Sequence, residues 1–200
     1  MYDALIIGGG AAGMSCALVL GSAKPKSFAA HKSIGIIMHQ RASHLQNALF
    51  NNVLGLAPGT LGADILESGK AQLEQLYPHV EQIEKEKVKS IVKASEGFTI
   101  TTNKNTYHSK LVVIAAGYTN LVHIDGLQHY LQPHPRAAVE KERMWLKNED
   151  HLVAEGLYVA GTMAGWRSQF AIAAGSGAQV ATDILTLWND GKHTKVHDKA

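Results

Sequence analysis

Residues 4–21 read ALIIGGGAAGMSCALVLG and combine three local patterns in a fixed order. Residues 4–7 are a short apolar run, which is typical of a buried strand in a parallel sheet. Three glycines follow, and residues 11–20 are good helix formers. Gly21 stands where a left-handed residue commonly ends a helix. The segment therefore predicts a strand, a tight turn and a helix.

The glycines of this turn have the spacing Gly8-x-Gly10-x-x-Gly13, which is the dinucleotide-binding fingerprint when it lies between a strand and a helix. The first glycine permits the tight turn, the second lets the backbone approach a pyrophosphate, and the third lets the helix pack close to the sheet. Amide groups at the helix start then hold the phosphates. Glycine-rich turns also arise for packing alone, but the flanking strand and helix favour nucleotide binding.

The fingerprint departs from the usual pattern at its ribose end. An acidic residue is usual at the end of the second strand, where this chain has Met38, His39 and Gln40. A neutral imidazole or amide can still hydrogen-bond a hydroxyl group. The sequence therefore leaves open whether His39 replaces the acidic ligand.

The rest of the chain predicts an α/β fold. Apolar runs at 34–38, 111–115 and 157–160 are typical of buried parallel strands. Short β-prone pieces lie at 88–94, 98–102 and 106–108 and predict a small antiparallel meander over one face of the sheet. We therefore expect a mostly parallel sheet with an antiparallel β meander, and a nucleotide at the carboxyl ends of the strands.

Two more helices and one long connection complete this prediction. The spacing of apolar residues predicts an amphipathic helix over 61–76, with Thr60 available as its cap. Polar residues 22–33 predict an exposed loop. One face of a closing helix is marked by Ala173, Gly177, Val180, Ile184 and Leu187.

The composition narrows the function classes. With 46% apolar and 18% charged residues, the 200 residues have the composition of one globular domain. The net charge of +2 comes from basic and acidic residues mixed along the chain, which argues against nucleic acid as a partner. Because Cys16 is the only cysteine, the chain has no internal disulfide and no CxxC pair. The start lacks a signal-peptide pattern and no apolar segment approaches the roughly 20 residues of a membrane span, so we expect a soluble, cytoplasmic protein.

Three segments resemble the FAD motifs of the thioredoxin reductase-like flavoproteins of the pyridine nucleotide-disulfide oxidoreductase superfamily. They are GGGAAGMSCALVLG from residue 8, LVVIAAG at 111–117, and GLYVAGT with QFAIAAGSGAQVA between 156 and 181. The segment QNALFNNVLGL at 46–56 is similar to that of members that oxidise small dithiols. The resemblance implies a single FAD/NAD(P)-binding Rossmann-like domain over residues 1–200, with FAD as cofactor.

The resemblance also implies which residues contact FAD. Toward its diphosphate and adenosine it places Gly8, Gly10, Ala11, Ala12, Gly13, His39, Gln40 and Val88. Toward its flavin and ribityl chain it places Asn47, Ala115, Ala116, Gly117, Gly161, Thr162, Gln169, Phe170 and Ala171. The family usually carries an aspartate where this chain has Thr162, so the sequence departs from the pattern there. The closing helix would point its amino terminus at the flavin and stabilise negative charge by roughly 0.3 to 1 kcal/mol.

The sequence lacks two features of full-length members of this family. Residues 118–156 stand where those members insert a nicotinamide-binding domain, which needs on the order of 100 residues. The CxxC pair is missing as well. We therefore expect an FAD-dependent oxidoreductase that receives electrons from an external donor, NAD(P)H or a protein, and passes them to an unknown acceptor. A non-catalytic flavin-binding module or redox subunit is an alternative, and an NAD-binding dehydrogenase is another.

Other residues have both a functional and a structural interpretation. Cys16 is expected to be an inert core thiol, and the histidines predict no metal site. Trp166 and Arg167 precede the closing helix and fit either a stacking or anion-binding role or a covering loop. The shortened connection carries His123, His129, His134 and Arg136, for which structural roles are favoured. The surface left by the missing insertion predicts association with another copy or another protein.

Overall fold

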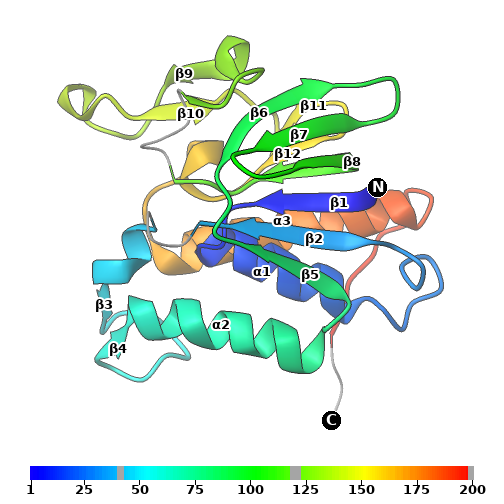
Figure 1. Cartoon of the computed structure of the whole chain (residues 1–200). Helices are drawn as coiled ribbons and strands as arrows, with labels where there is room; N and C mark the ends of the chain where they lie inside the picture. The colour runs from blue at the N-terminus through cyan, green and yellow to red at the C-terminus, as the bar shows by residue number, and fades with distance from the viewer. Residues whose placement is uncertain (40–42, 118–122, 198–200) are drawn as a thin grey trace.

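The computed structural model describes residues 1–39, 43–117 and 123–197. Its centre is an eight-stranded sheet whose parallel part has the order β12-β8-β1-β2-β5 (Figure 1). These strands are β1 (Tyr2–Ile7), β2 (Ile34–Met38), β5 (Val80–Glu84), β8 (Thr106–Ile114) and β12 (Leu157–Val159). β11 (Leu152–Ala154) pairs antiparallel with β12 at one edge. The predicted mostly parallel α/β architecture is therefore confirmed.

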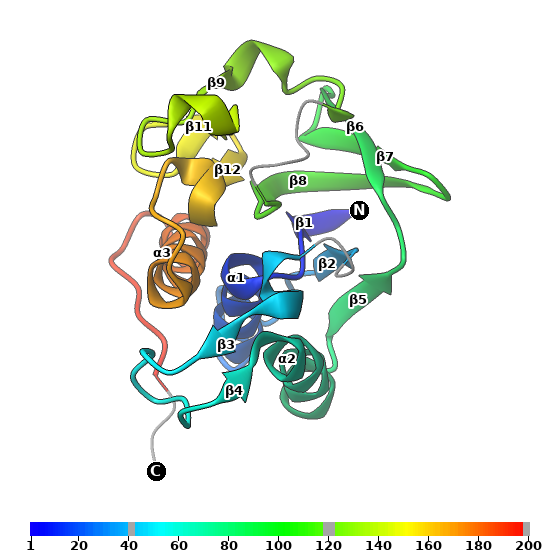
Figure 2. The ribbon, with the colours of Figure 1, turned by 90° about the vertical axis from the view of Figure 1, so that its left-hand side faces the viewer.

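One face of the sheet is covered by the helices α1 (Ala11–Ser22), α2 (Gly62–Leu76) and α3 (Phe170–Trp188), as Figures 1 and 2 show. α1 and α3 lie side by side and bury the side of β1 that carries Ala4 and Ile6. α3 is long and apolar enough to cross a membrane by length and composition alone, so the expectation that no segment approaches that length was wrong. Its buried residues Ile184 and Leu185 pack into this core, whereas Leu187, predicted for the buried face, is exposed.

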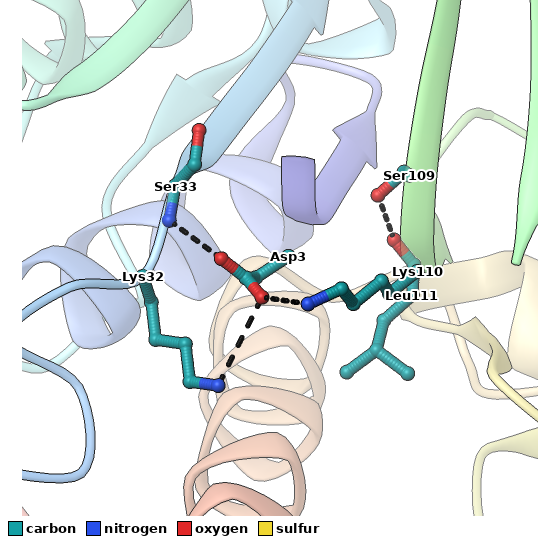
Figure 3. Close-up of polar contacts among 6 residues, drawn as sticks. All are labelled: Asp3, Lys32, Ser33, Ser109, Lys110 and Leu111. Carbon is teal, nitrogen blue, oxygen red and sulfur yellow. Dashed lines mark hydrogen bonds and ion pairs between the residues drawn. The ribbon is translucent and has the colours of Figure 1, made fainter. Parts of the chain in front are cut away.

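The opposite face is covered by the predicted meander. β6 (Val88–Lys93) and β7 (Phe98–Thr102) pair antiparallel, and their apolar side chains pack on those of β1 that point away from the helices. The pieces predicted at 106–108 and 111–115 are one strand, β8. Its first half pairs antiparallel with β7 and its second half parallel with β1 and β12. The buried Ser109, whose hydroxyl donates to the Leu111 carbonyl at 2.6 Å, lies at this change of partner and interrupts the apolar pattern (Figure 3).

Several elements were not predicted. They are β3 (Leu49–Phe50), β4 (Thr60–Leu61), β5, β9 (Leu131–Pro133), β10 (Met144–Leu146), β11 and the 3₁₀ helices η2 (His44–Asn47), η4 (Gln128–Tyr130), η5 (Val139–Lys141) and η6 (Gly161–Ala164). β3 and β4 form a short hairpin. β9 and β10 form a second hairpin within the 118–156 connection, and β10 packs against η6. This connection therefore lies against Gly161 and Thr162, which end the GLYVAGT segment.

Three local predictions were wrong. α1 continues through Gly21, whose lack of a side chain lets the helix pack against Tyr77, since a Cβ there would lie 2.9 Å from Tyr77 Cβ. Thr60 does not cap α2, since its hydroxyl donates to the Ala57 carbonyl at 2.6 Å and Leu61 is the N-cap residue. The 22–33 connection is exposed only in part, because Ala23 and Ala29 in it are buried.

At the edge where β1 begins, Asp3 ties β1 to both of its neighbours (Figure 3). Its carboxylate accepts hydrogen bonds from Ser33 N and Lys110 Nζ, each at 3.0 Å, and Lys32 Nζ lies 3.8 Å away. Ser33 precedes β2 and Lys110 belongs to β8. Burial alone would raise the pKa of Asp3, but the Ser33 amide and the Lys110 ammonium lower it below its ordinary value.

Candidate functional site

A cleft of about 460 Å³ lies at the carboxyl ends of the parallel strands. The end of β1, the glycine turn and the first turn of α1 form its floor, from Ile7 to Ala12. Ligands of open α/β sheets bind at this edge because the loops there connect strands to helices on both sides. The cleft is therefore the candidate nucleotide site.

The glycine turn has the geometry that the fingerprint requires. Gly8 has a φ of +118°, and a Cβ there would lie 2.4 Å from the carbonyl oxygen of Ala115. Gly13 lies behind the cleft wall, where a Cβ would lie 1.8 Å from the carbonyl oxygen of Gly8. At Gly10 the nearest atom to an added Cβ is Ser43 Oγ, at 3.7 Å. The first and third glycines therefore serve the turn and the packing, while the second leaves space in the cleft.

Two helices begin at this cleft. The N-cap residues are Gly10 for α1 and Gln169 for α3, and neither provides a side-chain cap. Neither helix has an acidic residue in its first turn. Gly177 of α3 lies so close to α1 that a Cβ on it would be 1.9 Å from the carbonyl oxygen of Ala12. This close packing brings two positive helix ends to one cleft, where they favour an anionic ligand.

One end of the cleft is polar. Of the residues expected to contact the adenosine, His39 and Val88 line this end, while Gln40 lies outside the described residues. Glu86, Lys87 and His123 also line this end and were not predicted as contacts. They come from the β5–β6 turn and from the start of the described part of the connection after β8. The polar end thus has the side chains and backbone groups to hold an adenosine.

The other end of the cleft is mostly apolar. The residues expected to contact the flavin and ribityl chain that line the cleft are Ala115, Ala116, Gly117, Gly161, Thr162, Gln169 and Phe170. Phe50 was not predicted, and its ring lies 5.2 Å from that of Phe170, centroid to centroid. Gly161 has a φ of +76°, and its amide donates to the buried hydroxyl of Ser176 at 2.5 Å. The last FAD-like motif is therefore held in a fixed turn beside the start of α3.

Besides Gly13, which lies behind the cleft wall, two predicted contacts do not line the cleft. Asn47 ends η2 with its side chain exposed, and Ala171 is exposed on the first turn of α3. Around Asn47 the residues that reach the cleft are Ser43, His44, Leu45, Ala48 and Phe50. Phe50 belongs to the same segment, 46–56, as Asn47. The β-prone residues around Phe50 were the sequence feature that could have pointed to it as a cleft residue.

Most of the other residues considered for a role at the site, in the connection and before α3, contact neighbouring parts of the chain instead. Arg136 donates from Nη1 to the Gly165 carbonyl at 2.6 Å, and its guanidinium lies 5.2 Å from the Trp166 ring centroid. His134 Nε2 lies 3.0 Å from the Thr162 carbonyl oxygen, and the His129 ring lies 3.8 Å from that of Tyr130, centroid to centroid. Arg167 is exposed. The connection therefore supports the 161–166 segment from outside.

Within the described residues, neither a reactive thiol nor a metal-binding cluster of side chains lies at the cleft. Cys16 is fully buried in α1, and burial raises its pKa. Among those residues, no group of three or more His, Cys, Asp or Glu side chains is placed to hold a metal ion.

Comparisons with curated proteins give two reductases as relatives. The ferredoxin–NADP reductase of Streptococcus mutans is 32% identical over 117 residues, which cover 58% of this chain and 34% of that protein. The ferredoxin–NADP reductase of Leuconostoc mesenteroides is 24% identical over 195 residues, which cover 97% of this chain and 52% of that protein. The chain thus spans between a third and about half of the length of these relatives.

Solved structures show the same fold. A thioredoxin reductase from Gloeobacter violaceus has a TM-score of 0.73 at 14% identity, covering 100% of this chain and 99% of that one. An oxidoreductase from Agrobacterium tumefaciens has a TM-score of 0.72 at 15% identity, covering 93% and 98%. Residues 2–175 match the family described as pyridine nucleotide-disulphide oxidoreductase. Because this match covers most of the chain, including the glycine turn and the start of α3, the chain belongs to the pyridine nucleotide-disulphide oxidoreductase family.

Proposed function

We propose that this chain is an FAD-dependent oxidoreductase in which electrons pass through the flavin from an external donor to an acceptor. We further propose that residues 1–200 form a single FAD-binding domain, with residues 118–156 in place of a nicotinamide-binding domain. Membership of the family supports the flavin-dependent oxidoreductase class. The observation that carries the proposal is that α1 and α3 both begin, uncapped by side chains, at one cleft.

The residues of the cleft fit FAD. The open space beside Gly10 admits a diphosphate, which the amides at the start of α1 would hold. His39 is placed to hydrogen-bond the adenosine ribose, and the backbone at Val88 to bind the adenine. Thr162 and Gln169 would lie along the ribityl chain and the flavin.

The protein contributes electrostatics and shelter at the flavin end. When bound, the flavin supplies the redox chemistry, because it can accept and release two electrons. The amino terminus of α3 stabilises negative charge there by about 0.3 to 1 kcal/mol, or about 2 when partly buried. The Phe50 and Phe170 rings would present an apolar surface to the flavin at this end. No described side chain at the cleft is assigned as a catalytic acid or base.

The acceptor has to reach the flavin directly. Family members that carry a CxxC pair can pass electrons to a protein thiol, but the only cysteine here, Cys16, has no exposed surface. Its raised pKa also keeps it protonated and unreactive. The electron donor is either a reduced nicotinamide nucleotide that binds transiently or a protein, because the 118–156 connection is too short for a nicotinamide-binding domain.

The test is anaerobic mixing of the FAD-loaded protein with NADH and, separately, with NADPH. Rapid bleaching of the flavin by either nucleotide supports the enzyme. Bleaching by neither, together with a stably co-purifying protein, would support the second candidate, a non-catalytic redox subunit. That candidate is favoured by one observation: β10 of the shortened connection packs on η6, within a connection too short for a donor domain.

The third alternative, an NAD-binding dehydrogenase, makes a different prediction. It requires a colourless protein whose melting temperature rises on addition of NAD. A yellow preparation that releases FAD on denaturation eliminates it.

A further inference from the structure

A buried carboxylate lies in the wall of the cleft at its polar end. Glu86 is only 6% exposed, although it belongs to the short β5–β6 turn and lines the cleft beside Lys87 and Val88. No ion pair places a cation within 4.0 Å of it among the described residues. A buried charge needs partners, because an unpaired one is strongly destabilising.

Three neutral donors bind this carboxylate, and all come from the β7–β8 hairpin: Thr102 ends β7, Asn105 lies in the turn and Tyr107 belongs to β8. Oε2 accepts from Thr102 Oγ1 at 2.6 Å, and Oε1 accepts from Asn105 Nδ2 at 2.7 Å and from the Tyr107 hydroxyl at 3.0 Å. Burial alone would raise the pKa of Glu86, but these donors, together with the positive charge of Lys104, lower it below its ordinary value. The carboxylate therefore stays charged and is fixed in one orientation.

The backbone of the same turn is fixed on both sides. Lys87 N donates to Asn103 Oδ1 at 2.7 Å, and Asn103 N donates back to the Lys87 carbonyl at 3.0 Å. Lys85, at a φ of +59°, donates from its amide to the Met38 carbonyl at the end of β2, at 3.0 Å. The turn is thus joined to the strand end that carries His39 and to the β7–β8 turn.

We propose that Glu86 is a positioning residue for the adenosine half of the nucleotide. By holding the 85–88 turn against the β7–β8 turn, it fixes the backbone of Lys87 and Val88 at the place where the adenine would bind. This inference rests on the proposed function, because that function places the adenosine at this end of the cleft. Loss of the anchor would leave the turn free to move, and binding would then have to order it again.

The test compares two carboxylates at opposite ends of the parallel strands: Glu86 follows the end of β5, and Asp3 lies near the start of β1. Glu86→Gln keeps the size of the side chain but replaces one acceptor oxygen with a donating amide, while Asp3→Asn makes the same change far from the cleft. FAD titration of the apoprotein gives the Kd, and AMP as a competitor reports the adenosine end alone. We expect Glu86→Gln to weaken both FAD and AMP by about tenfold, and Asp3→Asn to leave both unchanged at a similar loss of melting temperature.

A second pair of variants tests the same hydrogen bond from the other side. Thr102→Val removes the donor to Glu86 without changing the side-chain volume greatly, whereas Thr102→Ser keeps the hydroxyl. We expect Thr102→Val to weaken AMP and FAD by about threefold to tenfold and Thr102→Ser to bind as the wild type does. This pair decides the question if Glu86→Gln does not fold.

The outcomes separate the two proposals. Wild-type affinity for AMP and FAD in Glu86→Gln, or in Thr102→Val, overturns the role of Glu86 and leaves the proposed function intact. An equal loss of affinity in Asp3→Asn also overturns it, because the effect would then follow stability alone. If the wild-type protein binds neither FAD nor AMP, the proposed function itself is contradicted.

Discussion

Gly10 and Gly13 belong to the same motif but have different surroundings. We expect Gly10→Ala to keep its melting temperature, because the added Cβ has no neighbour nearer than 3.7 Å, and to weaken FAD by at least about tenfold because the methyl group lies where the diphosphate approaches. Gly13→Ala should instead lose about 1–3 kcal/mol of stability, since its Cβ would lie 1.8 Å from a backbone oxygen. Thermal melts and FAD titrations of both variants check this. Normal FAD binding by Gly10→Ala would contradict the placement of the diphosphate.

The lowered pKa of Asp3 predicts that the free energy of unfolding depends on pH. Its folded pKa is depressed, so its contribution to the free energy of unfolding is fully present above its ordinary value of 3.8 and is lost as the pH falls through the lower folded value. We expect Asp3→Asn to lower stability at pH 7 by about 1 kcal/mol. The gap between wild type and variant should close below the ordinary pKa. Urea unfolding at several pH values measures it, and a gap that persists in acid would refute this account of Asp3.

At the scale of elements, α3 is expected to tune the flavin. Gln169→Glu places a negative charge at the amino terminus of α3, in the wall of the cleft. A carboxylate there opposes negative charge on the flavin, so the midpoint potential should become more negative by about 6–20 mV, which corresponds to roughly 0.3–1 kcal/mol for two electrons. Gln75→Glu makes the same charge change on α2, away from the cleft, and should leave the potential unchanged. Equal potentials for all three proteins would show that α3 does not act on the flavin.

Elements with a strong local pattern could be predicted from the sequence. β1, α1 and β2 each carry an unbroken apolar or helix-forming run, and the glycines between them fix the turn. β8 could not be recognised as one strand, because Ser109 and Lys110 interrupt its apolar run where its pairing changes from antiparallel to parallel. β5 was missed because it is half exposed and reads VEQIE, which has little apolar character.

The candidate site was predictable only where a motif carries it. The glycine turn, the 115–117 segment and the start of α3 lie in contiguous motifs, and the structure brings them to one cleft. Phe50, Glu86 and His123 come from three separate turns or connections, and only the fold brings them together. Asn47 was chosen by resemblance, but η2 leaves its side chain exposed outside the cleft.

At the scale of the whole molecule, apolar side chains remain exposed in and near the 118–156 connection. Val139 is 91% exposed, Leu152 42% and Trp166 40%. Since exposed apolar patches mark interaction sites, we expect this region to contact a second copy of the chain or another protein. Light scattering over a range of concentrations should give a mass above the 21.5 kDa of one chain. A monomer at every concentration would contradict the homo-oligomer.

The central claim is that this chain holds FAD along the carboxyl ends of its strands. The visible absorption spectrum of the freshly purified protein, followed by identification of the small molecule released on heating, tests it most directly. We expect the bands of an oxidised flavin and the release of FAD. A colourless protein that stays colourless after incubation with excess FAD and removal of the unbound cofactor would contradict it.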